Sequence, residues 1–165
     1  MKDLLIKLIK LYQQLLQLKM EELTPSQQIS LIAQDGFHKG KDFTDDRKVD
    51  DEVSCAFAVS TILHEQDESV PIVTGTSTLS NFLEKSPLFK KVLEPEEGVV
   101  VISPTGEGHN PDMPHGHTGI YIDGDKIMSN SSATGLWIQN YTRSSWRTRY
   151  YWEGRYPVRL YKKVI

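Results

Sequence analysis

Apolar residues recur at regular spacing over residues 1–23 and predict a long amphipathic helix. Six keep the heptad rhythm of a coiled coil and five more widen the stripe: Met1, Leu4, Leu8, Leu11, Leu15 and Leu18, then Leu5, Ile9, Tyr12, Leu16 and Leu23. The polar face carries mainly lysines. The helix is therefore expected to pack on its own domain, to pair with a second copy, or to lie on an anionic membrane surface, unless it is a removed or disordered tail.

Helical signals continue to about residue 85. Residues 24–27 have the sequence of a capping box with proline at the first helical position. Residues 37–51 lack periodicity and predict a loop. The expected helices run from Thr24 to near Gly36, from the acidic and polar residues 50–54 through Leu63, and from a cap at Thr76 or Ser77 to Lys85.

Beyond residue 97 the pattern changes to short apolar runs typical of strands. The expected strands are Gly98–Ser103, His117–Asp123, Lys126–Asn130, Leu136–Gln139 and Val158–Val164. Gly124-Asp125 predicts a hairpin turn between the second and third of them. Helices first and an antiparallel sheet afterwards predict an α+β fold, with residues 24–165 as one domain behind the helix of residues 1–23.

Composition narrows the class of protein. The chain has 165 residues, 38% of them hydrophobic, and a net charge of −3, which gives no general attraction to nucleic acid. Its single cysteine cannot form an internal disulfide. Lysines and glutamines interrupt residues 4–18, so this stretch resembles neither a membrane span nor a secretory signal. We expect synthesis in the cytoplasm without a signal peptide.

Cys55, the only cysteine, falls in or next to the first turn of a predicted helix. Free backbone N–H groups and the helix dipole stabilise a thiolate at that position, and a thiolate is the nucleophilic form of cysteine. The competing interpretation is a small buried apolar residue. The sequence around Cys55 alone favours the second interpretation.

The predicted hairpin supplies partners for Cys55. His117 opens one strand beside a loop rich in glycine and proline, and Asn130 ends the next strand at the same end of the hairpin. An amide there can hold one imidazole nitrogen while the other faces a thiolate, as in nucleophilic catalysis. Ser129 and Ser131 are rivals for this orienting role. His115 shares the loop.

The sequence contains residues for two other kinds of site, a zinc site and a surface of aromatic and arginine side chains. His109, Asp112, His115 and His117 can be arranged as zinc ligands, but no further ligand pattern completes the set, so we expect no metal and no cofactor. Aromatic residues alternate with arginines from Trp137 to Arg159. Such a pattern can bind single-stranded nucleic acid, stack on sugar rings, hold acidic peptides, or simply stack on itself at a sheet edge. The acidic net charge argues against nucleic acid.

The stretch Gly116-His-Thr-Gly-Ile-Tyr-Ile122, after a lone cysteine at a helix start, resembles the papain-like cell-wall peptidases of the CHAP and NlpC-type families. The resemblance covers about residues 25–163. It implies a papain-like fold with Cys55 as nucleophile, His117 as general base and Asn130 as orienting residue. Ser54 stands where NlpC-type members usually have aspartate, and the Cys55 backbone N–H replaces a tyrosine as the candidate oxyanion donor.

The resemblance further implies hydrolysis of amide bonds in peptidoglycan, at the cell wall, after release or lysis. We expect His115, Trp137 and Trp146 to contact this substrate. The alternative is a non-catalytic module that binds cell-wall glycan and oligomerises through residues 1–23.

Overall fold

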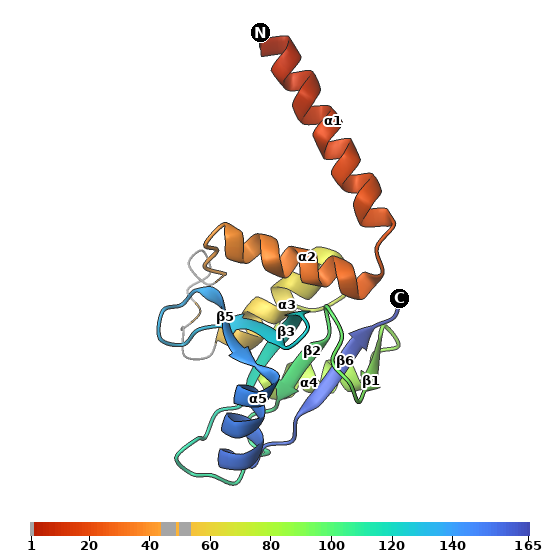
Figure 1. Cartoon of the computed structure of the whole chain (residues 1–165). Coiled ribbons are helices and arrows are strands. Elements are labelled where there is room, and N and C mark those ends of the chain that lie inside the picture. Colours follow the sequence, from red (N-terminus) through yellow and green to blue (C-terminus); the bar gives the residue numbers. More distant parts are fainter. Residues whose placement is uncertain (1, 44–48, 50–53) are drawn as a thin grey trace.

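The structure, a computed structural model, describes residues 2–43, 49 and 54–165. It is an α+β arrangement of helices followed by an antiparallel sheet, as predicted, and the sheet has six strands (Figure 1). The elements are α1 (Lys2–Glu21), α2 (Pro25–His38), α3 (Ser54–Gln66), α4 (Thr76–Lys85), β1 (Phe89–Val92), β2 (Val100–Ser103), β3 (His117–Asp123), β4 (Lys126–Asn130), β5 (Trp137–Thr142), α5 (Arg143–Trp146), the π-helix η3 (Arg147–Glu153) and β6 (Arg159–Lys163).

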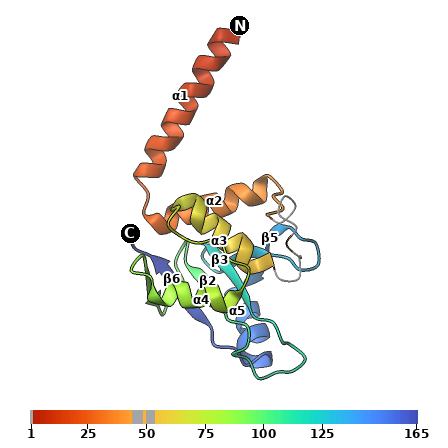
Figure 2. The ribbon, with the colours of Figure 1, turned by 180° about the vertical axis from the view of Figure 1, so that it is seen from behind.

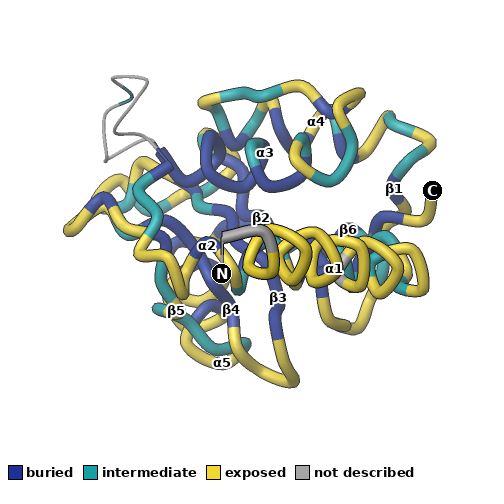
Figure 3. The backbone as a smooth tube through the Cα atoms, turned by 90° about the horizontal axis from the view of Figure 1, so that it is seen from above, coloured by how far each residue is buried: buried dark blue, intermediate teal, exposed yellow. Residues whose placement is uncertain are grey.

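Helix α1 extends away from the other elements (Figures 1 and 2). Its apolar side chains are 48–65% exposed in Leu4, Leu5, Ile6, Leu8, Ile9, Leu11, Tyr12, Leu15 and Leu18. Seen from above, almost its whole length is exposed (Figure 3). The expectation that this helix packs on its own domain is wrong, because these side chains bury nothing there.

Helix α2 begins with the predicted capping box. The Thr24 hydroxyl accepts the Gln27 backbone N–H, and the Gln27 side chain accepts the Thr24 backbone N–H. The helix ends at His38, close to the predicted end near Gly36. A Cβ at residue 36 would lie 3.2 Å from the Phe43 ring, so this glycine serves close packing inside the helix.

Helix α4 spans Thr76–Lys85 as predicted, but its cap differs. Gly75 is the N-cap residue and offers no side chain. The Thr76 hydroxyl instead lies 2.8 Å from the Thr105 hydroxyl and accepts the Thr105 backbone N–H. Strand β1 and the helices α5 and η3 were not predicted. The acidic helix start expected at residues 50–53 lies outside the described residues.

The sheet has strand order β1-β6-β2-β3-β4-β5, with every neighbouring pair antiparallel. Two apolar clusters cover the sheet, one on each face. Helices α2, α3 and α4 pack on one face through Ile29, Val59 and Leu79, whereas α5 and η3 pack on the other through Trp146 and Tyr150. Side chains alternate between these faces along each strand.

The β3–β4 hairpin turns at Gly124-Asp125 as predicted, but it contains a register shift. Asp123 pairs with Lys126, whereas Ile120 pairs with Met128, so a bulge lies between Tyr121 and Asp123. Continuing that register places Thr118 opposite Asn130. A shift of one residue exchanges the faces toward which side chains point.

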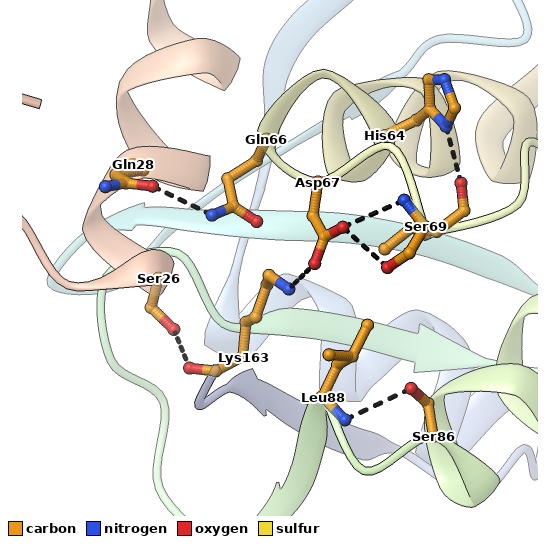
Figure 4. Close-up of polar contacts among 10 residues, drawn as sticks. Ser26, Gln28, His64, Gln66, Asp67, Ser69, Ser86, Leu88 and Lys163 are labelled. Atoms are coloured by element: carbon orange, nitrogen blue, oxygen red, sulfur yellow. Dashed lines mark hydrogen bonds and ion pairs between the residues drawn. The ribbon is translucent and has the colours of Figure 1, made fainter. Parts of the chain in front are cut away.

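An ion pair between a buried lysine and a partly exposed aspartate ties β6 to the end of α3. Lys163 is 1% exposed, and its Nζ lies 2.6 Å from Oδ2 of Asp67 (Figure 4). The hydrogen bond from Lys163, with further bonds from Ser69, lowers the pKa of Asp67 to about 2. The helix layer is thereby joined to the second strand of the sheet.

Candidate functional site

Cys55 is the second residue of α3 and lines a pocket of about 230 Å³. Its side chain is 7% exposed. The other lining residues come from α4, from the preceding turn and from the loop before β3: Thr74, Gly75, Thr76, Ser77, Thr105, His115 and Gly116. The single cysteine and one histidine thus line the same pocket, together with the hydroxyl-bearing residues Thr74, Thr76, Ser77 and Thr105.

Hydrogen bonds fix the loop that carries His115. Ser77 donates its hydroxyl to the Thr105 carbonyl at 2.6 Å, and the Gly116 N–H donates to the Thr105 hydroxyl at 3.0 Å. Gly116 also needs to be glycine, because a Cβ there would lie 1.9 Å from the Ser103 carbonyl oxygen. The exposed His115 therefore directly precedes a backbone position that is anchored.

The Cys55 thiol is protonated in this environment. Burial raises the pKa of Cys55 to about 11, although the backbone N–H of Thr118 stabilises the thiolate and acts in the opposite direction. The position at a helix start is thus as predicted, but desolvation outweighs it. Attack by Cys55 requires a base that removes its proton.

His117, the predicted base, lies on the other face of the sheet. Its ring stacks on Trp146 and Tyr150, with centroids 5.5 and 5.6 Å away, and both partners belong to the α5–η3 side. Burial, with the charge of Arg149, lowers the pKa of His117 to about 3. The imidazole is neutral and packed among rings, and Cys55 packs with the opposite helix layer.

The expected contact between His117 and Asn130 is not formed. Nε2 of His117 lies 2.8 Å from the hydroxyl of Ser129, which in turn donates to Oδ1 of Asn140 at 2.7 Å. Asn130 points the other way and donates to the Ser54 hydroxyl at 2.5 Å. The bulge explains this correction, because it moves Asn130 to the face of α3 and leaves Ser129 beside His117. The sequence had offered Ser129 as an alternative to Asn130 for orienting His117, whereas it gave no indication of Asn140.

A second hollow of about 300 Å³ adjoins the Cys55 pocket. Its walls include His117, Arg149 and Tyr150, and it shares His115 and Gly116 with the first pocket. The segment of residues 115–117 thus separates two spaces at one end of β3. Cys55 faces one space, His117 faces the other, and His115 borders both.

Of the three predicted substrate-binding residues, one lines the Cys55 pocket and two are buried elsewhere. His115 lines the Cys55 pocket as a contact residue would. Trp137 is a core residue, since it is 1% exposed and donates its indole N–H to the Ala33 carbonyl. This contradicts the prediction of substrate contact. Trp146 is equally buried and donates to the Ser103 hydroxyl, but it borders a different pocket.

No three histidine, cysteine, aspartate or glutamate side chains gather into a metal-binding group within the part of the chain that the structure describes. Over the same residues, no helix has the length and apolar character needed to cross a membrane.

Comparison with known proteins adds no relative. Neither a family model, nor a curated protein, nor a solved structure matches this chain.

Proposed function

We propose that this chain is a cysteine-dependent amidohydrolase or peptidase with a papain-like fold, that it acts on peptidoglycan, and that His115 rather than His117 is its base. One observation carries the proposal: Cys55, at the start of α3, and His115 line the same pocket. Acyl transfer needs a nucleophile and a base that open into one space, and this pocket holds both residue types.

The chemistry follows from the neutral thiol. His115 takes the proton of Cys55 as the sulfur attacks the amide carbonyl carbon, and the tetrahedral intermediate then expels the amine, which His115 protonates. Water, deprotonated by the same imidazole, hydrolyses the thioester and releases a carboxylate. Hydrogen bonds from the Thr118 N–H stabilise the sulfur while it is anionic.

Two residues expected in the triad take supporting roles. Asn130 holds the Ser54 hydroxyl next to Cys55 and so fixes the first turn of α3. His117 is held by Ser129 and by its aromatic neighbours, and therefore anchors the strand end that presents His115. Neither residue takes or gives a proton in this scheme.

Peptidoglycan as the substrate rests on the resemblance of residues 116–122 to cell-wall peptidases. Purified peptidoglycan should therefore release new amino groups when mixed with the protein. The variants Cys55→Ala and His115→Ala should each lose activity by a factor of at least about 100, the contribution of a positioned base. His117→Gln should retain most of it.

The comparison of the two histidine variants decides the role of each. Thermal unfolding of every variant serves as the folding control. Loss of activity in a folded His117→Gln protein, with His115→Ala active, would restore the triad predicted from sequence and overturn the assignment of His115. Activity of Cys55→Ala would end the cysteine mechanism altogether.

A second candidate function is a non-catalytic cell-wall binding module. The burial of Cys55 favours it, because a thiol with a pKa of about 11 is also what a structural cysteine shows. Binding of intact protein to peptidoglycan without any release of amino groups would select this alternative.

Helix α1 is an association surface in either case, and its partner is a second copy of the chain. Leu4, Leu8 and Leu11 continue a heptad seam that is 56–65% exposed. The polar face carries Gln13, Gln14 and Gln17 as well as lysines, whereas helices bound to anionic lipid are rich in lysine and arginine. Sedimentation should show an oligomer that deletion of residues 1–23 converts to a monomer. Monomeric full-length protein that binds anionic vesicles would show the membrane to be the partner instead.

A further inference from the structure

Two adjoining pockets lie on the face of the sheet opposite Cys55. The first, of about 330 Å³, is bordered by Tyr121 and Trp146 from the second apolar cluster, and the other, of about 360 Å³, lies next to it. Both include Arg143 and Arg147, and neither includes a residue of the Cys55 pocket. This surface has no part in the mechanism proposed above.

Two faces of the α5–η3 segment line the two pockets, one face for each pocket. Arg143, Arg147 and Tyr151 follow one another four residues apart and line the first pocket, while Ser144, Thr148 and Trp152 line the second. The segment continues as a seven-residue π-helix. Such helices are rare and frequently occur at functional sites. Buried Tyr150 stacks on His117 of β3 and so holds this one against the sheet, which gives the exposed side chains a rigid base.

Positive charge is in excess within the first pocket. Its cations are Lys91, Arg143, Arg147 and Arg159. Arg159 forms a bidentate pair with Glu107, and Arg143 lies 3.0 Å from a carboxylate oxygen of Glu94, whose side chain is 75% exposed. Among the described residues Arg147 has no ion pair, and its guanidinium lies 5.9 Å from the Tyr151 ring centre. Of the two guanidinium groups that belong to both pockets, that of Arg147 is thus the one open to an anion.

Aromatic rings stand beside these cations. Trp152 is 66% exposed and Tyr151 is 45% exposed, and their ring centres lie 4.7 Å apart. Because these large rings are exposed, their apolar surface is removed from water when a ligand covers them. A flat ring beside a planar guanidinium suits a ligand that has both a sugar face and an anionic group.

We propose that the two pockets formed by Arg143, Arg147, Tyr151 and Trp152 are a binding site for an anionic glycan, a sugar chain that carries carboxylate or phosphate groups. The guanidinium groups bind the anion, and the two rings stack on sugar faces. Binding here is independent of Cys55, and would hold the chain on a glycan whether or not the opposite pocket hydrolyses amides.

The test uses the full chain with Cys55→Ala, so that no hydrolysis changes the ligand and failure of the proposed catalysis leaves the result unaffected. Calorimetry measures binding of a hexuronate oligosaccharide, a hexose phosphate, a neutral chitohexaose and a single-stranded oligothymidine. The hexuronate, the hexose phosphate, or both should bind more tightly than chitohexaose, and the tighter of the two identifies the anion. Equal binding of the neutral sugar, or no binding of either anion, would overturn the proposal. Tighter binding of the oligothymidine would replace the glycan by nucleic acid.

Substitutions locate the site. Arg147→Gln should weaken binding about tenfold, the usual value of one charge-assisted hydrogen bond. Lys85→Gln removes the same charge from α4, which packs on the opposite face, and should leave the affinity unchanged. Trp152→Ala should weaken binding of the hexuronate several-fold. Unchanged affinity in Arg147→Gln or in Trp152→Ala would show that the ligand binds elsewhere.

Discussion

Alkylation of Cys55 measures the state of the thiol directly, because the chain has no other cysteine. The pKa of Cys55 is raised from 9.0 to about 11. At pH 8 the ionised fraction therefore falls from about one in ten to about one in a thousand. A thiolate of higher pKa is intrinsically more nucleophilic, and this gain of about tenfold offsets part of the roughly hundredfold loss of ionised thiol. We expect iodoacetamide to react with folded protein about tenfold more slowly than with protein unfolded in urea, before the 7% exposure slows it further.

Mass spectrometry of the intact chain gives both rates from one series of time points. His115→Ala should change the folded rate by less than about twofold, because the proposed base acts only when substrate is attacked. Faster alkylation of the folded protein than of the unfolded one would refute this account. It would mean that the thiolate is already formed, and loss of that speed in His115→Ala or in His117→Gln would identify the imidazolium that stabilises it.

Other predictions concern the scaffold. As pH falls from about 4 to about 2, protonation of Asp67 should remove about 2 kcal/mol from the free energy of unfolding, and Asp67→Asn should make the dependence on pH in denaturant titrations shallower by this amount. Gly116→Ala should lower both the melting temperature and the activity, because its Cβ would clash with backbone. Ser129→Ala should sharply reduce stability but spare alkylation of Cys55.

Local sequence patterns predicted most of the secondary structure. Strands β3 and β4 have their predicted ends, since alternation and the Gly124-Asp125 turn are local signals. The strand Phe89–Val92 was missed because it is a short edge with two lysines, which carries little apolar signal. The π-helix was missed because its residues, rich in arginine and aromatic side chains, have no helical apolar stripe that a sequence reveals.

The candidate site was predicted less well, for a reason that lies in the hairpin. Counting from the turn places His117 and Asn130 on one face, but the bulge adds one residue and separates them. No residue type between Tyr121 and Asp123 marks a bulge. Trp137 was assigned to substrate for a similar reason, since burial beneath Phe43 and Ala33 depends on the packing of α2. His115, which was expected to contact substrate, lines the Cys55 pocket, and its role there stays a prediction.

The bulge also bears on how such a hairpin diverges. Because a single residue decides which side chains share a face, one deletion within residues 121–123 would place His117 and Asn130 on the same face of the hairpin. One insertion or deletion can thus give His117 a different set of neighbouring side chains although no residue at the site is substituted. Alignments that allow gaps in this strand would score both forms alike, although their histidines occupy different chemical surroundings.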